Sequence, residues 1–122
     1  PNLLVTDSFE AGRFGTSFDY ALAVSLFTHL PLNQIGRCLV RVREVLEPGA
    51  AFYATFFEAP SPLHLDPIGH EPGGVTTYYD ADPYHLSFRE VRWLARLADL
   101  AVERIGEWGH PRDQRMLRFG RA

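Results

Sequence analysis

His29 is the side chain best suited to proton transfer in this sequence, because an imidazole titrates close to neutral pH. It closes an apolar run and stands two residues before Pro31. In this position it would act as a base toward a reacting group, or alternatively bond to backbone in a tight loop before the proline. Ser25 and Thr28 lie nearby, but neither has an adjacent base, and no G-x-S-x-G segment is present to make a serine nucleophile.

A second group of chemically capable residues follows further along the chain. It contains residue types that bind metals, in the pattern HxDxxxHE: His64, Asp66, His70 and Glu71. That spacing would not bring the side chains together from one helix or one strand. We therefore predict no metal site.

His29 lies at the end of an apolar segment, residues 18–30. Within it, residues 20–27 contain one polar side chain, Ser25. A short, unbroken apolar run of this kind is typical of a strand buried on both faces of a parallel sheet. The segment is therefore expected to hold His29 at the end of a strand.

A helix and a second strand are expected next. In residues 33–46 the apolar side chains fall at helical spacing, which predicts one face packed on a sheet. Pro48 and Gly49 predict a turn, and residues 50–57 form a second apolar run. Strand, helix and strand in this order predict a βαβ unit with a right-handed crossover and parallel strands.

Three segments together resemble the middle of class I S-adenosylmethionine-dependent methyltransferases. In that family an FD pair opens the fourth strand, an HLP-type loop leads to the next helix, and LxPGG precedes the fifth strand. The corresponding residues here are 18–19, 25–31 and 43–49, with Ala50 in place of the second glycine. Residues 86–90 and 109–111 are also similar to the family's C-terminal portion.

The resemblance implies an α/β chain with a partial Rossmann-like methyltransferase fold. Its mostly parallel sheet would have the order four, five, seven, six, with the last strand antiparallel and helices flanking it. Residues 2–6 would be the third strand, and residues 101–108 and 114–121 the last two. Residues 1–122 would form a single truncated domain in which residues 58–85 are a long loop or lid. Ser87 and Glu90 have the spacing of a capping box, which predicts a helix from there to about Leu97.

The resemblance also implies the cofactor S-adenosylmethionine. Asp7, Ser8 and Phe9 would lie beside its adenine, and Ala23 and Val24 beside its methionine arm, outside the carboxyl ends of the strands. The methyl acceptor would contact residues of the long loop: Tyr78, Tyr79, Tyr84 and His85. No G-x-G pattern occurs among the 122 residues, so we expect weak or absent cofactor binding, and no activity, from this chain alone.

Two functions follow as alternatives. One is the C-terminal portion of a methyltransferase that acts on a small-molecule acceptor. The other is a non-catalytic remnant that serves as a dimerisation or interaction module. Strand four would be an apolar edge here, which favours a homodimer.

The composition of the chain limits its expected partners and its expected cellular location. A net charge of −3 argues against a nucleic-acid surface, although all 12 basic residues are arginine. No apolar run approaches the roughly 18 residues of a membrane span, and no signal pattern opens the chain. The single cysteine, Cys38, lies on the buried side of the expected helix and cannot form an internal disulfide. We therefore expect a cytoplasmic protein without membrane partners.

Overall fold

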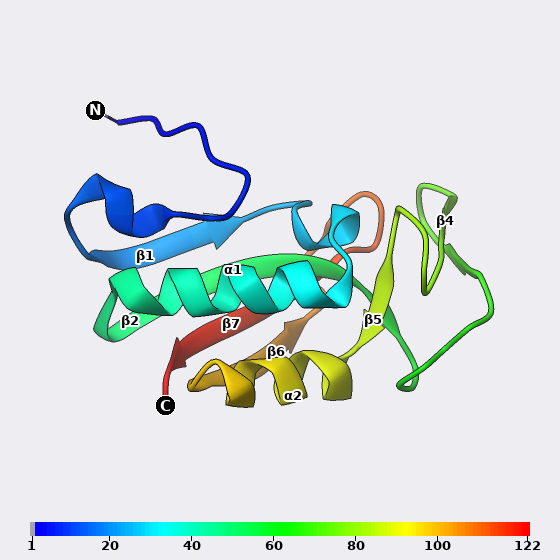
Figure 1. Cartoon of the computed structure of the whole chain (residues 1–122). Helices are drawn as coiled ribbons and strands as arrows, with labels where there is room; N and C mark the ends of the chain where they lie inside the picture. The colour runs from blue at the N-terminus through cyan, green and yellow to red at the C-terminus, as the bar shows by residue number, and fades with distance from the viewer. Residues whose placement is uncertain (1) are drawn as a thin grey trace.

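The computed structural model describes residues 2–122, which form a sheet with two α-helices on one of its faces (Figure 1). The strands of the main path follow the order β1-β2-β7-β6. A short strand, β5, pairs with β2 outside this path. The bounds of these elements are β1 Phe18–Ala23, α1 Leu32–Val45, β2 Leu46–Ala59, β5 His85–Ser87, α2 Phe88–Leu97, β6 Leu100–Gly106 and β7 Arg115–Arg121.

The expected order of the four main strands is found, but the sheet is less parallel than expected. β1 and β5 each pair with β2 in parallel. β7 lies antiparallel between β2 and β6. The carboxyl ends of β1 and β2 and the start of β7 therefore meet at one edge of the sheet, which we call the carboxyl edge.

The hydrophobic core lies between the sheet and the two helices. Phe52, Ala54 and Phe56 alternate along β2 and point into this core, because successive side chains of a strand face opposite sides. Phe27 and Phe119 pack edge to face there, with ring centroids 6.2 Å apart. From the helices, the core receives Ile35, Cys38, Leu39, Val91, Leu94 and Ala95.

The prediction of a strand buried on both faces is wrong for residues 18–30. Only Phe18–Ala23 forms a strand, and a short 3₁₀ helix, η2 Phe27–His29, follows. Tyr20 is 75% exposed and Leu22 is 67% exposed. Both lie on the face opposite the helices, where no described element covers β1.

Residues 2–6 do not form the expected third strand. They have no regular structure, and Leu3 and Val5 are exposed. A strand needs a neighbour for its backbone groups, and β1 forms a ladder only with β2 among the described residues.

Pro48 and Gly49 do not form a separate turn but belong to β2, which begins directly after α1. Gly49 has a positive φ of 84°. The β1–β2 register jumps at this point, from Phe18 opposite Leu46 to Tyr20 opposite Ala51. Pro48 and Gly49 therefore lie in a bulge of β2, beyond which the two strands continue in a new register.

Residues 58–85, predicted to form a long loop or lid, contain a short hairpin. A two-stranded sheet, β3 Ile68–His70 and β4 Val75–Thr77, lies within this segment, and β5 begins at its end. The helix after it begins with the expected capping box, in which Ser87 and Glu90 bond each other's backbone N–H groups. None of the described helices has the length and apolar character needed to cross a membrane.

Candidate functional site

The carboxyl edge begins where β1 ends, at a cluster of three hydrogen-bonded residues from separate segments, Ser25, Thr55 and Gln114, which we call the polar knot. Ser25 has a positive φ of 60°, so the chain turns sharply there. The N–H of Ser25 donates to Thr55 Oγ1 on β2 at 2.8 Å, and Thr55 Oγ1 donates to Gln114 Oε1 at 2.7 Å. Gln114 Nε2 in turn donates to Ser25 Oγ at 3.0 Å. The three side chains fix the exit of β1 against β2 and β7.

Directly after this turn, η2 presents His29 to solvent. The ring Nδ1 of His29 lies 2.8 Å from Asp82 Oδ1, and both side chains are more than half exposed. A carboxylate can only accept, so the neutral ring donates from Nδ1 and keeps its lone pair on Nε2. The structure therefore pairs the His29 ring with a side-chain carboxylate and not with a backbone group.

A cavity of about 600 Å³ is lined in part by residues 30–33, which follow His29 in the sequence, but His29 and Asp82 are not among its lining residues. Two of the residues expected to touch a substrate, Tyr79 and Tyr84, line it. The lining is mostly apolar and aromatic and also contains Leu30, Pro31, Leu32, Asn33, Asp80, Leu86, Trp93 and Leu94. Tyr78 does not line this cavity, and His85 is fully buried with 0% exposure, so His85 has no surface free to touch a ligand.

The residues expected to hold the cofactor are only partly brought together. Phe9 and Ala23 line a second cavity, of about 250 Å³, between the N-terminal segment and β1. Asp7 and Val24 are exposed and do not line it. Ser8 Oγ donates to Glu10 Oε1 at 3.0 Å, and this bond is the main reason that the pKa of Glu10 lies below its usual value. Cys38 also lines this cavity, and burial raises the pKa of its thiol to about 12.

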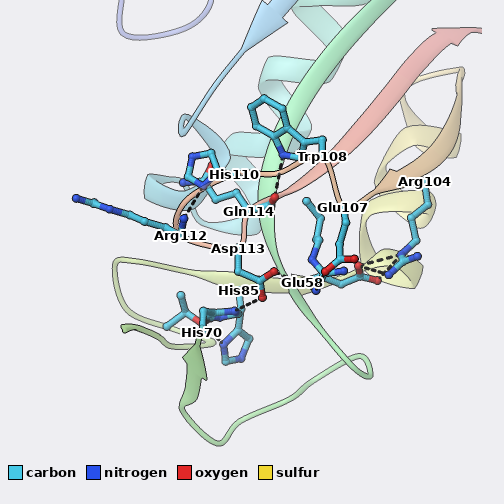
Figure 2. A network of polar contacts seen from close by, with 12 residues as sticks. Glu58, His70, His85, Arg104, Glu107, Trp108, His110, Arg112, Asp113 and Gln114 are labelled. Carbon is cyan, nitrogen blue, oxygen red and sulfur yellow. Dashed lines mark hydrogen bonds and ion pairs between the residues drawn. The ribbon is translucent and has the colours of Figure 1, made fainter. Parts of the chain in front are cut away.

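A third, polar cavity of about 260 Å³ lies beyond the end of β2. It is lined by His70 and by four charged residues from separate parts of the chain, Glu58, Arg104, Asp113 and Arg115, together with Ala59 and Pro60. Arg104 Nη2 lies 2.7 Å from Glu58 Oε1 (Figure 2). Arg115 Nη2 lies 3.1 Å from Asp113 Oδ1. No local spacing in the sequence indicates this cavity. Within residues 2–122, no three His, Cys, Asp or Glu residues are grouped so as to hold a metal ion.

Similarity to known proteins is found in the structure of this chain but not in its sequence. No family model matches the sequence, and no curated protein matches it. The structure of the CcbJ methyltransferase from Streptomyces caelestis is 14% identical, with a TM-score of 0.63, over 88% of this chain and 62% of that one. The mitomycin 7-O-methyltransferase MmcR is 16% identical, with a TM-score of 0.62, over 88% of this chain and 30% of that one.

A third neighbour is an enzyme of another reaction class. This pericyclic reaction enzyme is 10% identical, with a TM-score of 0.58, over 88% of this chain and 27% of that one. The present chain thus spans less than two thirds of each of these three structures. Together the neighbours establish a class I methyltransferase-like fold. The fold alone does not decide the reaction.

Proposed function

We propose that this chain forms the C-terminal portion of an S-adenosylmethionine-dependent methyltransferase that acts on a small-molecule acceptor. The observation that carries the proposal is the His29–Asp82 pair, which follows β1 at the carboxyl edge of a methyltransferase-like sheet. Residues 30–33, which follow His29 directly in the sequence, line the large aromatic cavity. Ligands of open α/β sheets bind outside the carboxyl ends of the strands, and His29 follows the carboxyl end of β1.

The described residues fit only part of the cofactor. Phe9 and Ala23 offer an apolar surface at the end of β1, but the cavity of about 250 Å³ is smaller than the roughly 300–1,000 Å³ of typical small-molecule sites. Bound S-adenosylmethionine supplies a methyl group that is already activated. Since the chain lacks a G-x-G loop, we propose that tight cofactor binding needs contacts beyond these residues.

His29 is proposed to take the proton that the acceptor loses. Asp82 holds Nδ1–H, so that Nε2 is free to accept this proton from a hydroxyl or an amine. The carboxylate then stabilises the imidazolium that forms. A positioned base of this kind contributes roughly 10²- to 10⁴-fold in rate when the acceptor must be deprotonated.

The aromatic cavity is proposed to bind the body of the acceptor. Tyr79, Tyr84 and Trp93 offer ring faces to an organic molecule, and the largely apolar lining excludes water. Holding the acceptor in one orientation is the main requirement of methyl transfer, because the methyl donor is already reactive.

Two variants and one control test the proposal in the longest natural form of the protein. Radiolabelled S-adenosylmethionine is supplied with a panel of phenols and amines, and methyl transfer is measured together with cofactor binding by calorimetry. His29→Gln and Asp82→Asn should slow transfer by about 10²-fold or more, with cofactor affinity unchanged. His110→Gln, a histidine outside this site, should leave the rate unchanged. Absence of cofactor binding would refute the proposed methyltransferase activity, whereas equal rates in all variants would refute the proposed role of His29 as the base.

We also propose that the open edge of β1 pairs with a second copy of the chain. β1 has a ladder on one side only among the described residues, and Tyr20 and Leu22 are exposed beside it. Such an edge offers unpaired backbone groups to another strand. Light scattering at increasing protein concentration tests this, and a monomer at the highest concentration would contradict it.

A further inference from the structure

The polar cavity beyond β2 contains a histidine that the proposed methyl transfer does not use. The side chain of His70 is 5% exposed and lines this cavity. Its Nδ1 forms no hydrogen bond within residues 2–122 and lies 3.9 Å from Asp113 Oδ2 (Figure 2). The ring is nearly buried, and Nδ1, which has no hydrogen-bond partner in this part of the chain, faces the open space of the cavity, where it can meet a ligand atom.

A buried chain of hydrogen bonds leads away from the other nitrogen of this ring. His70 Nε2 lies 2.7 Å from Thr77 Oγ1, and Thr77 Oγ1 lies 3.0 Å from His85 Nδ1. His85 Nε2 lies 2.6 Å from the backbone oxygen of His64. Thr77 and His85 are both fully buried, so water does not interrupt this relay.

The direction of every bond in the relay follows from its last acceptor. The His64 oxygen can only accept, so His85 Nε2 carries a hydrogen and Nδ1 of the neutral His85 ring accepts. His85 has no carboxylate partner among the described residues, and a buried charge without a partner is costly. Thr77 therefore donates its one hydroxyl hydrogen to His85 and accepts from His70 Nε2–H. This leaves the lone pair of His70 on Nδ1, facing the cavity.

The surroundings keep the His70 ring neutral. Burial is the main cause that lowers its pKa, and the positive charge of Arg115 acts in the same direction, while Asp113 opposes them. Phe57 packs against the ring with centroids 4.6 Å apart. Nδ1 is therefore an acceptor at neutral pH and not an N–H donor.

We propose that this cavity binds a hydroxyl group of a small polyhydroxylated ligand, with His70 Nδ1 accepting its hydrogen. A hydroxyl both donates and accepts, and the cavity offers one acceptor on His70 beside guanidinium donors on Arg115 and Arg104. An ammonium group fits less well, because it cannot accept from a guanidinium. The two carboxylates are already paired with arginines, so the four charged side chains carry no net charge that would attract a cation.

Histidine ring ¹⁵N spectroscopy tests this proposal, with myo-inositol as an uncharged polyol and methylammonium as the amine probe. Inositol should produce a saturable shift at His70 Nδ1, and methylammonium should not. His70→Gln keeps a donor for Thr77 but removes the ring acceptor, so inositol should bind about three- to tenfold more weakly, as expected for one lost hydrogen bond. The control His110→Gln should bind as the wild type does. A His70 that carries its hydrogen on Nδ1, no saturable shift with inositol, or stronger binding of methylammonium would overturn the proposal.

The relay has a test of its own. Thr77→Val keeps the shape of the side chain but removes the hydroxyl, so the ¹⁵N shifts of His70 should lose their single-tautomer pattern and inositol binding should weaken. Thr77→Ser should restore both. Identical spectra for the valine and serine variants would overturn the relay. The site is independent of methyl transfer, so it would stand even if His29→Gln proved silent.

Discussion

The knot at the end of β1 makes a quantitative prediction, because its two buried members, Thr55 and Gln114, depend on each other. Gln114→Leu removes the acceptor of the Thr55 hydroxyl and the bond to Ser25. A buried hydroxyl without a partner costs about 1–3 kcal/mol, and a lost hydrogen bond about 0.5–1.5 kcal/mol. We expect Gln114→Leu to lower the free energy of unfolding by about 2–4 kcal/mol.

Thr55→Val breaks the same bond from the other side and leaves the Ser25 N–H without its acceptor. We expect a loss of about 1–3 kcal/mol. In the double variant, neither partner of the Thr55–Gln114 bond remains to be unsatisfied. The combined loss should therefore fall short of the sum of the single losses by about 1–2 kcal/mol.

Urea unfolding of the four proteins, followed by circular dichroism and intrinsic fluorescence, measures this cycle. The exposed Thr76→Val is the matched control and should change the free energy of unfolding by less than about 0.5 kcal/mol. If the two single losses add without coupling, the hydrogen bond at 2.7 Å does not contribute as described.

Two further predictions concern His70 and Gly73. Because the pKa of His70 is lowered in the folded state, the unfolded chain binds more protons than the folded chain below about pH 6.5. The contribution of His70 to stability is therefore present above this pH and should be lost as the pH falls through the folded pKa. His70→Gln should flatten this part of the plot of melting temperature against pH. Parallel profiles for the two proteins would contradict this. Gly73 has a φ of 98°, and a Cβ there would lie 2.9 Å from the Pro111 oxygen, so Gly73→Ala should cost about 1–3 kcal/mol in thermal unfolding. Gly12→Ala, where a Cβ would meet nothing within 4 Å, is its control and should cost far less.

Local patterns in the sequence predicted local structure well. The apolar spacing of residues 33–46 agrees with α1 at Leu32–Val45, and the Ser87–Glu90 pair forms the capping box that its spacing indicates. Both features depend on residues within one or two turns of each other. The strand order, in contrast, came from the family resemblance and not from any pattern in the chain.

The errors concern properties that depend on distant partners. An apolar run such as residues 20–27 is compatible with burial on one face or two, and the elements that cover the sheet decide between them. The strand expected at residues 2–6 failed for the same reason, since pairing needs a neighbour.

In the candidate site, too, the sequence indicated individual residues but not their distant partners. His29 was singled out from its residue type and position, but its partner Asp82 lies 53 positions along the chain and has no motif of its own. His70 was considered only as a metal-ligand type. Its relay to His85 depends on the β3–β4 hairpin placing Thr77 between the two rings, which no spacing in the sequence indicates.

The uncovered face of β1 has a consequence for the solubility of the chain. Residues 21–27 contain no charge, no proline and no glycine, which is the composition of segments that assemble into intermolecular β-structure. They lie in and directly after the strand whose free edge and exposed Tyr20 and Leu22 are open to other molecules. Asp19 is the one charged side chain within this strand. Aggregation during expression or storage should therefore begin at β1, and a charged residue on its exposed face would act as a gatekeeper without touching the core.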